Sequence, residues 1–268
     1  MIHESAVIDK SAVIGKNVEI GPYVVIGENV VLGDNVKIIA NAYLEHCEIG
    51  EGTVISPFAA IGTAPQDLGY KGELTKAIIG KNCIIKEYVT VHRGAEEGTS
   101  TVVGDKCLLM VGTHVAHNCV LENEVIMANQ ATIGGHVHIG YGCFLGGQSV
   151  FHQNIRIGEL SIVSGASAAR MDILPYTKSE GIPCAPHGIN AIGLRRRGFS
   201  KEDRDALHKA VRLLTSPKYN TTQAIEVIQK EIPQNKYVDN MIDFIKTSKR
   251  GVTLKSKAAF GAMGGSEE

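Results

Sequence analysis

The sequence predicts a parallel β-helix built from six-residue repeats and followed by a helical segment. One observation behind this prediction is an apolar residue at every sixth position over much of the first 163 of 268 residues. The other is the composition, with 30 Gly, 8 Tyr and 6 Phe but no Trp. A narrow core of Ile, Val, Leu, Ala and Cys explains why large aromatic side chains are scarce. Neither an α-helix of period 3.6 nor a simple alternating strand produces a period of six.

The repeat runs in three stretches, with one slip of phase and two interruptions. All 24 positions reached by counting in sixes are apolar, namely Ile8, Ile14, Ile20, Ile26, Leu32, Ile38, Leu44, Ile49, Ile55, Ile61, Ile79, Ile85, Val91, Val103, Leu109, Val115, Leu121, Met127, Ile133, Ile139, Leu145, Phe151, Ile157 and Val163. The residue four further on is usually small or β-branched, as at Ala12, Val18 and Thr53. Three hexads then make an 18-residue coil, and we expect about eight coils stacked roughly 4.8 Å apart. The residue after each step is often Gly, as at Gly15 and Gly21, which we attribute to a turn with unusual backbone angles.

The two interruptions, at about 63–77 and 94–101, are expected to be loops that leave the β-helix. Such loops are either tolerated surface insertions or, because a rigid scaffold holds them, carriers of function. Four of the six cysteines fall on the small inward position, namely Cys83, Cys107, Cys119 and Cys143. Packing explains them, and the chain has no C-x-x-C motif, so we expect neither a zinc site nor a disulfide.

The repeat stops past residue 172, and we expect the β-helix domain to cover 1–185. Pro175, Pro183 and Pro186 mark a linker to a helical domain over 186–254. Ser200 is placed to cap a helix whose apolar residues fall within 206–214, and two more amphipathic helices are expected around 224–228 and 238–245. The tail 255–268 is expected to be disordered.

The net charge of -1 conceals an asymmetry. Residues 1–192 hold 12 Lys and Arg against 19 Asp and Glu, whereas residues 193–257 hold 15 against 7. This basic region suggests an acidic partner or a phosphate-bearing substrate near the junction. No apolar run approaches the ~18 residues of a membrane span. The amino end lacks the layout of a signal peptide, so we expect a cytoplasmic protein. We also expect no stable membrane insertion and no nucleic-acid partner.

Three histidines are related by the length of a coil. His136 lies 19 residues after His117 and His152 lies 35 after it, so all three are expected near one column, with His114 close by. They are stacked surface side chains, a metal site, or a general base with substrate contacts. The metal site is disfavoured because His-x-x-His on an extended segment splays its rings and no carboxylate joins them. The neighbouring Gly134 and Gly135 expose backbone N–H groups that suit an oxyanion.

An ordered set of motifs makes the chain resemble the UDP-N-acetylglucosamine O-acyltransferase family. Besides the hexads, these motifs are QDL-x-Y (Gln66, Asp67, Leu68, Tyr70), HRG (His92–Gly94), HVAH (His114–His117), GGH (Gly134–His136), VFHQ (Val150–Gln153) and GLRRRGF (Gly193–Phe199). Hexads alone would indicate only the wider acyltransferase superfamily. The resemblance implies a left-handed β-helix and a homotrimer whose site lies between adjacent chains.

The resemblance also implies the reaction. An (R)-3-hydroxyacyl group would pass from acyl carrier protein to the glucosamine 3-hydroxyl of UDP-N-acetylglucosamine, the first step of lipid A biosynthesis. No metal and no cofactor would be needed beyond the phosphopantetheine thioester of the donor.

Roles carry over by matching motifs. His117 matches the general base and the amide of Gly135 the oxyanion donor, while Asn118 stands where Asp is usual. The expected substrate contacts are Asp67 and His114 on the sugar side, with Gln66 as a further substrate contact. His136 and Gln153, with His152 beside them, are expected on the acyl and nucleotide side, and Asn190, Arg196 and Arg197 at the nucleotide and phosphates. Gly69, where Lys is usual, and Ile192, where an acidic residue is expected, are further departures.

Arginine is well suited to binding the phosphates of the nucleotide, because its fork of N–H donors fits a diphosphate or the carboxylates of an acidic protein. The competing interpretation of Arg195–Arg197 is a solvated run at a helix start, where cations oppose the helix dipole.

The alternatives are N-acylation of a 3-amino UDP-sugar and a catalytically weak β-helix scaffold. A coenzyme A-dependent acetyltransferase and a γ-class carbonic anhydrase share the hexads but differ in donor or metal.

Overall fold

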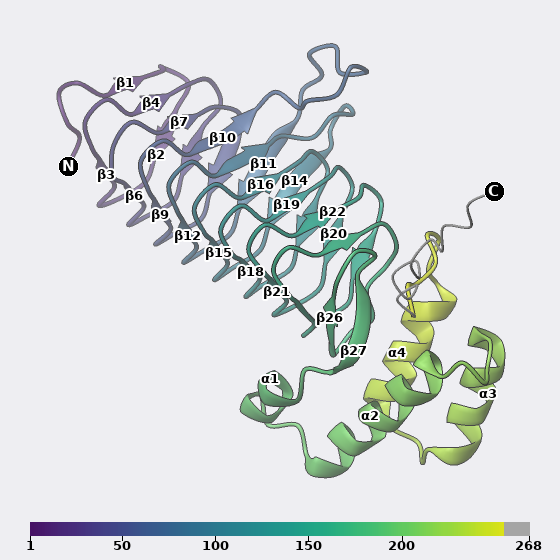
Figure 1. Cartoon of the computed structure of the whole chain (residues 1–268). Coiled ribbons are helices and arrows are strands. Elements are labelled where there is room, and N and C mark those ends of the chain that lie inside the picture. Colours follow the sequence, from purple (N-terminus) through teal and green to yellow (C-terminus); the bar gives the residue numbers. More distant parts are fainter. Residues whose placement is uncertain (255–268) are drawn as a thin grey trace, which may run out of the picture.

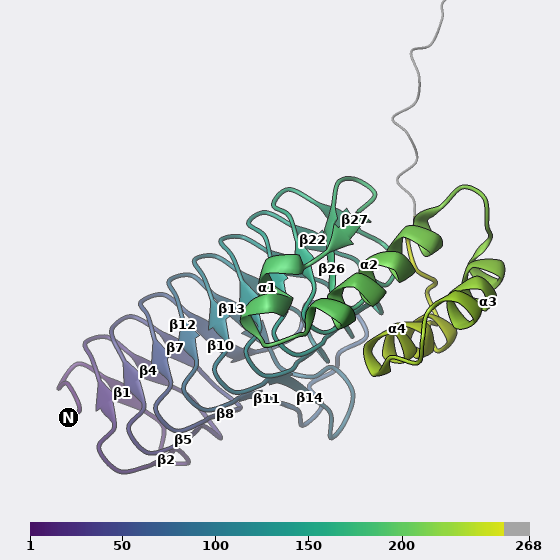
Figure 2. The same ribbon diagram turned by 90° about the horizontal axis from the view of Figure 1, so that it is seen from below.

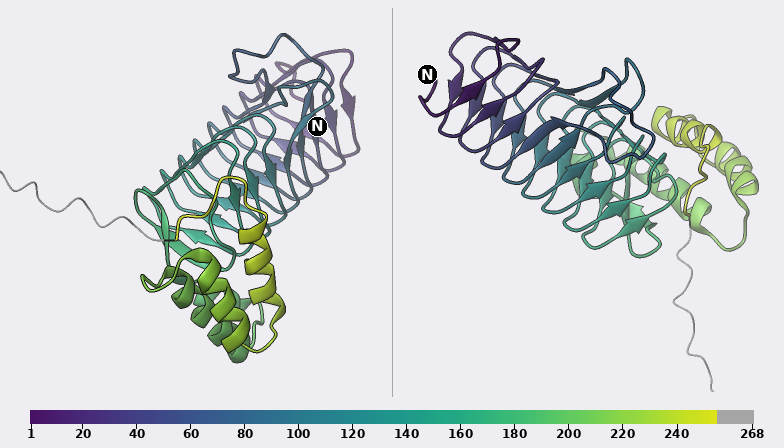
Figure 3. Two further views of the ribbon diagram at one scale, coloured as in Figure 1. Left: turned by 90° about the vertical axis from the view of Figure 1, so that its right-hand side faces the viewer. Right: turned by 90° about the horizontal axis from the view of Figure 1, so that it is seen from above.

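The computed structural model describes residues 1–254, which form a three-sided β-helix with helices gathered at the end opposite the amino terminus (Figures 1 and 3). Most strands are two residues long, and each pairs with strands one coil away. All of this pairing is parallel except between β26 and β27. Each hexad thus supplies one strand and one corner.

The strands form three sheets, one on each face of the prism. Sheet 1 contains β1 (Val7–Ile8), β4 (Val25–Ile26), β7 (Tyr43–Leu44), β10 (Ala60–Thr63), β13 (Thr90–His92), β16 (His114–Val115), β19 (Thr132–Ile133), β22 (Val150–Phe151) and β25 (Ala168–Ala169). Sheet 2 contains β2 (Val13–Ile14), β5 (Val31–Leu32), β8 (Cys47–Ile49), β11 (Lys76–Ile79), β14 (Ser100–Val103), β17 (Val120–Leu121), β20 (His138–Ile139) and β23 (Arg156–Ile157). Sheet 3 contains β3 (Glu19–Ile20), β6 (Lys37–Ile38), β9 (Val54–Ile55), β12 (Ile84–Ile85), β15 (Leu108–Leu109), β18 (Ile126–Met127), β21 (Phe144–Leu145), β24 (Ile162–Val163), β26 (Thr177–Glu180) and β27 (Ala185–Ile189).

The chain turns a corner each time it passes from one sheet to the next. We call the column of corners between sheets 1 and 2 edge 1–2, and name edges 2–3 and 3–1 in the same way. The sheets hold 9, 8 and 10 strands, in line with the predicted number of coils.

The core fills the inside of the prism, as the period predicts. Every predicted inward position from Ile20 to Val163 is buried, and only Ile8 and Ile14 near the open amino-terminal end are partly exposed. All six cysteines are buried free thiols, and burial raises the pKa of Cys143 to about 11. These thiols act as small apolar packing groups.

The explanation that the sequence suggested for the corner glycines holds at Gly62, which has φ 81°, but is wrong for Gly15, Gly21 and most of the others. Positive φ occurs two residues later, for example at Asn17 (φ 55°) and Asn35 (φ 59°), where Asn tolerates the left-handed region. The glycines are needed for close packing between coils instead. A Cβ on Gly21 would lie 1.6 Å from the carbonyl oxygen of Ile39 in the next coil.

Both predicted interruptions form loops, and both leave the prism at edge 1–2. Loop 1 spans residues 64–75, between β10 and β11, and loop 2 spans residues 93–99, between β13 and β14. The longer loop 1 projects from the prism (Figure 1). The loops touch, since the Gly98 N–H donates to the Leu74 carbonyl at 3.2 Å.

Four helices follow the β-helix: α1 (Ala191–Arg196), α2 (Lys201–Thr215), α3 (Thr221–Glu231) and α4 (Lys236–Lys246). The last three confirm the predicted helices, and Ser200 caps α2 by accepting from the Asp203 N–H. Short α1, which the sequence analysis did not predict, lies beside the prism (Figure 2). Leu160, Leu174 and Tyr176 of the last coils share a second apolar core with the helices.

The expected domain boundary at residue 185 falls at the start of β27, which pairs with β26 as an antiparallel hairpin. The expected tail, 255–268, lies outside the described residues. No helix within residues 1–254 is both long enough and apolar enough to cross a membrane.

Candidate active site

Two of the predicted histidines meet on edge 1–2, where both loops emerge. His117 lies in the corner between β16 and β17, and His136 in the corresponding corner of the next coil. Their rings touch edge to face, with centroids 5.1 Å apart. The 18-residue period therefore places these two side chains together as predicted.

Hydrogen bonds determine which nitrogen of His117 carries the proton. The Asn118 Oδ1 atom accepts from the Ala95 N–H of loop 2 at 2.9 Å, which orients the amide with its oxygen toward this donor. The same oxygen lies 2.8 Å from His117 Nδ1. Because Oδ1 only accepts, Nδ1 must donate, and Nε2 of the neutral ring is left with a free lone pair. His117 thus has the tautomer of a base whose acceptor is Nε2.

The Nε2 atom of His117 faces the backbone of Gly135, which has no side chain. A Cβ added to Gly135 would come within 2.6 Å of His117 Nε2, so the ring lies directly against this glycine. The Gly135 N–H has no acceptor among residues 1–254. A proton acceptor and an unused N–H donor therefore lie side by side, the pair that acyl transfer requires.

Loop 1 brings a carboxylate to the same place. Asp67 Oδ2 lies 3.8 Å from His117 Nε2, whereas Oδ1 accepts from the Gly69 N–H at 2.8 Å. The His117 side chain is 13% exposed and that of Asp67 is 39% exposed, so the ring is sheltered while the carboxylate remains open to a ligand. Gln66, beside Asp67, is exposed.

His114 lies three residues before His117, in β16 on the outer face of sheet 1. Its Nδ1 is 2.7 Å from Thr90 Oγ1, and its ring meets His92 edge on, with centroids 4.8 Å apart. Burial lowers the pKa of His114, and burial together with His114 and His117 lowers the pKa of His92 to about 4. Both rings are therefore neutral near pH 7.

His152 and Gln153 stand apart from the histidine pair in the contacts that they make. Both are exposed, and His152 Nδ1 lies 3.1 Å from the Gln153 carbonyl and 3.3 Å from Arg250 Nη2. The Gln153 backbone nitrogen packs against Gly134. His152 thus contacts the carboxyl-terminal region instead of His117.

The nucleotide-side candidates Asn190, Arg196 and Arg197 lie on α1 and its caps, away from His117. Arg197 binds Glu124 at 2.9 Å and the Tyr141 hydroxyl at 2.5 Å, both in corners of edge 2–3. Asn190 caps α1 through Oδ1 and donates from Nδ2 to the Leu160 carbonyl at 2.8 Å, so both of its polar atoms are engaged within the chain. Arg196 is exposed, and its side chain has no partner in the described chain.

One argument about the arginine run is wrong. Arg195 and Arg196 lie in the last turn of α1, where cations are favoured by the helix dipole, and not at a helix start. Because these charges are favourable where they lie, their position in the helix is no argument for a functional role. Within residues 1–254, no group of three or more His, Cys, Asp or Glu side chains is arranged to hold a metal ion.

Comparisons with known proteins identify the family of the chain. A family profile described as UDP N-acetylglucosamine O-acyltransferase, domain 2, matches residues 172–253, and one described as the GMPPB C-terminal domain matches residues 1–65. The acyl-[acyl-carrier-protein]–UDP-N-acetylglucosamine O-acyltransferase of Synechocystis is 43% identical over 201 residues, which is 75% of this chain and 72% of that protein. The protein of the same name from Thermodesulfovibrio yellowstonii is 42% identical over 206 residues, 76% of this chain and 80% of that protein.

The chain belongs to the UDP-N-acetylglucosamine O-acyltransferase family.

Solved structures of UDP-N-acetylglucosamine O-acyltransferases confirm the predicted left-handed β-helix with a carboxyl-terminal helical domain. LpxA from Bacteroides fragilis has a TM-score of 0.91 and 42% identity, covering 94% of this chain and 99% of that one. LpxA from Acinetobacter baumannii has a TM-score of 0.90 and 39% identity with the same coverage.

The departures from the acyltransferase motifs have visible consequences. Asn118 adopts φ 59° and orients His117 as a carboxylate would, but it adds no charge. Gly69 supplies the N–H that binds Asp67, a backbone contact that does not depend on a lysine side chain. Ile192 is exposed on α1.

Two residues that border this candidate site were not predicted from the sequence. Glu96 of loop 2 lies with Oε1 3.5 Å from His136 Nε2, and His92 lies behind His114. His92 stood in a quoted motif and Glu96 in a predicted loop, but no spacing rule relates a loop residue to a corner.

Proposed function

We propose that this protein transfers an (R)-3-hydroxyacyl group from acyl carrier protein to the glucosamine 3-hydroxyl of UDP-N-acetylglucosamine, the first step of lipid A biosynthesis. The names of its relatives supply the substrates. The observation that supports the chemistry is the free Nε2 of His117 beside the unused N–H of Gly135. The donor thioester is carried on the phosphopantetheine of acyl carrier protein, so the chain itself supplies no cofactor. Both reactants are water-soluble, which agrees with a cytoplasmic reaction.

The residues around His117 account for each step. Nε2 removes the proton of the sugar hydroxyl as its oxygen forms a bond to the thioester carbonyl carbon. The carbonyl oxygen becomes an oxyanion that the Gly135 N–H stabilises, by roughly 3–4 kcal/mol. The C–S bond then breaks, and the imidazolium returns its proton to the departing thiolate. Asn118 keeps Nδ1 as a donor throughout, so the ring gains and loses charge only at Nε2.

The acceptor sugar is aligned from both sides of His117. Asp67 Oδ2 is positioned to accept from a sugar hydroxyl near Nε2, and His114 presents a neutral ring on sheet 1. His136, which touches both His117 and Glu96, borders the same space.

The distance between the two groups of candidate residues supports a site shared by two chains. His117 lies on edge 1–2, but Arg197 is tied to edge 2–3, so one prism does not bring the base and the arginines together. Sheet 3 also presents a column of apolar side chains on its outer face, formed by Val54, Ile84, Leu108, Ile126, Phe144 and Ile162. None of them is buried within the chain, which is typical of a surface that meets another copy. We propose a homotrimer in which Arg196 and Arg197 bind the diphosphate beside the His117 of a neighbour.

The activity is tested with purified protein, a pool of hydroxyacyl carrier proteins of several chain lengths, UDP-N-acetylglucosamine and its 3-amino analogue. Mass spectrometry should find an O-acylated UDP-N-acetylglucosamine. If only the 3-amino analogue is acylated, the acceptor is the amino sugar and the proposed acceptor is wrong. His117→Ala should lower kcat by about 100- to 10,000-fold. His138→Ala is the matched control, because His138 is a half-exposed histidine on sheet 2 paired with Glu122. Full turnover by His117→Ala would contradict the mechanism.

The shared site is tested by mixing a variant that lacks the base with a variant that binds the UDP-sugar weakly, at sugar concentrations well below KM. Arg196→Ala should weaken UDP-sugar binding by about 1.5–3 kcal/mol, with Arg195→Ala as the control. Co-refolding His117→Ala chains with Arg196→Ala chains should raise activity above either variant alone, because some sites then combine two intact halves. No recovery in a verified mixed oligomer would exclude a site built from two chains.

A further inference from the structure

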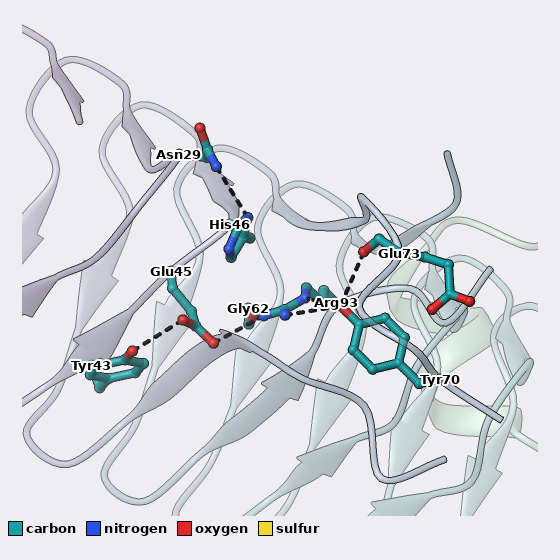
Figure 4. A network of polar contacts seen from close by, with 8 residues as sticks. All are labelled: Asn29, Tyr43, Glu45, His46, Gly62, Tyr70, Glu73 and Arg93. Carbon is teal, nitrogen blue, oxygen red and sulfur yellow. Dashed lines mark hydrogen bonds and ion pairs between the residues drawn. The ribbon is translucent and has the colours of Figure 1, made fainter. Parts of the chain in front are cut away.

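Arg93 lies at the start of loop 2 and connects it to loop 1. Its side chain is 12% exposed, and Nη1 donates to Glu45 Oε1 and to the Gly62 carbonyl, both at 2.9 Å. Nε and Nη2 both donate to the hydroxyl of Tyr70, at 3.1 and 2.9 Å (Figure 4). The guanidinium thus joins a corner of the prism to loop 1.

Tyr70 is held from several directions. Its hydroxyl accepts the two bonds from Arg93 and donates to the Glu73 carbonyl at 3.0 Å (Figure 4). The Arg93 guanidinium also lies 5.5 Å from the centre of the tyrosine ring. Bonds from a charged donor are stronger than neutral ones, so this side chain is firmly anchored.

The anchored tyrosine ends the turn that carries Asp67. The Tyr70 N–H donates to the Asp67 carbonyl at 3.1 Å, and the Gly69 N–H donates to Asp67 Oδ1 at 2.8 Å. The backbone and one carboxylate oxygen of Asp67 therefore belong to a turn that Arg93 fixes. The other oxygen, Oδ2, points to His117 Nε2 at 3.8 Å.

Apolar packing does not hold this turn. Leu68, at its centre, is fully exposed, and Gln66 and Gly69 are exposed as well. The far end of loop 1 is fixed by loop 2 at Leu74. The Leu74 N–H donates to Glu97 Oε2, and the Leu74 carbonyl accepts from the Gly98 N–H. Before the turn the chain is held at Pro65, which is buried, and after it by the polar anchor at Tyr70, which ties the carboxyl-terminal end of the turn to the prism.

We propose that Arg93 and Tyr70 act as a brace, without touching substrate, that sets the position of Asp67 relative to His117 and so the affinity for the acceptor sugar. Both are positioning residues, and the inference rests on the proposed function, in which Asp67 binds the sugar. Loss of the brace leaves the base and the oxyanion donor in place but lets the sugar-binding carboxylate move.

Tyr70→Phe is the sharpest test, because it removes only the hydroxyl. The KM for UDP-N-acetylglucosamine should rise about tenfold, a loss within the range that bonds from a charged donor contribute, while the KM for the acyl donor stays near wild type and the melting temperature falls by only about 2–4 °C. Tyr23→Phe is the matched control, since the exposed Tyr23 hydroxyl has no partner within residues 1–254. Arg93→Lys should resemble Tyr70→Phe, because lysine keeps the charge beside Glu45 but lacks the fork of donors.

The decisive measurement combines the brace with its target. In an Asp67→Ala background, Tyr70→Phe should change the KM for the sugar no further, since its effect passes through Asp67. A further tenfold rise there, or equal losses for both substrates, would overturn the brace and indicate a general structural role.

A crystal structure of Tyr70→Phe separates failure of the brace from failure of the proposed function. Displacement of Asp67 from His117 supports the brace whether or not the wild type acylates UDP-N-acetylglucosamine. An unchanged distance between Asp67 and His117 refutes the brace even in an active enzyme.

Discussion

Edges 1–2 and 2–3 of the prism share one repeat but use it differently. His117 on edge 1–2 occupies the same position in its hexad as Asp105 and Asn123 on edge 2–3. Asp105 Oδ1 accepts the Lys81 N–H of the preceding coil at 2.7 Å, and Asn123 Oδ1 accepts the Asp105 N–H at 2.7 Å. On edge 2–3 these polar side chains therefore form hydrogen bonds between one coil and the next.

At the same hexad positions on edge 1–2, two groups make no hydrogen bond within residues 1–254: the Nε2 of His117 and the N–H of Gly135. The loops take over the missing contacts, since Ala95 of loop 2 orients Asn118. Reactive groups arise here where the coil-to-coil bonding of the repeat is interrupted. Substitutions on edge 1–2 should therefore reduce activity, and those on edge 2–3 should reduce stability.

After His117→Ala, Gly135→Ala should give the largest effect on edge 1–2. The added Cβ would lie 2.6 Å from His117 Nε2 and displace the ring, so kcat/KM should fall about 100- to 1,000-fold with little change in melting temperature. Gly147→Ala is the control, because Gly147 holds the same hexad position on edge 3–1 and a Cβ there would lie 3.2 Å from the Asn129 carbonyl oxygen. Equal activity of the two variants would remove the special role of Gly135.

His92 should make the stability of edge 1–2 depend on pH. Its pKa is about 4 in the folded chain and near 6.5 when unfolded, so between these values only the unfolded chain binds the proton. The free energy of unfolding should fall as the pH drops through this window, by up to about 1.4 kcal/mol per pH unit. Urea titrations at several pH values should show a smaller slope for His92→Leu; an identical slope would contradict this origin.

Asn123→Ala tests edge 2–3. It removes the acceptor of the Asp105 N–H, so the free energy of unfolding should fall by about 1 kcal/mol, with kcat/KM unchanged. Chemical denaturation and the acylation assay measure the two quantities in parallel. A loss of activity without a loss of stability would erase the difference between the edges.

Asn118→Asp should have the smallest effect. A carboxylate at His117 Nδ1 stabilises the imidazolium, so kcat should rise about threefold, or roughly 0.6 kcal/mol, and the acid limb of the pH profile should move to higher pH. The Ala95 N–H and the φ of 59° suit Asp as well as Asn, so folding should not change. A limb that moves to lower pH would contradict the assigned tautomer.

Much of the fold follows from the period alone. An apolar residue at every sixth position must point inward to avoid water, which determines the coil, the core and the contact between His117 and His136. The predicted helices were confirmed for a similar reason, since their apolar spacing and the Ser200 cap are local signals.

Other features were beyond the reach of spacing. Glu96 and Asp67 approach His136 and His117 from loops, and loop paths depend on contacts such as the one between Arg93 and Tyr70, not on a period. Most of the corner glycines were misinterpreted because their constraint comes from the next coil, 18 residues away.

By itself, the sequence determined a triangular β-helix with histidines on one edge, because burial of apolar side chains is periodic and local. Only the tertiary structure decided that His117 offers Nε2, that Asp67 is held beside it, and that the Arg197 side chain contacts another edge. These features depend on the direction of single hydrogen bonds between segments far apart in the chain. No pattern of residue types specifies those directions.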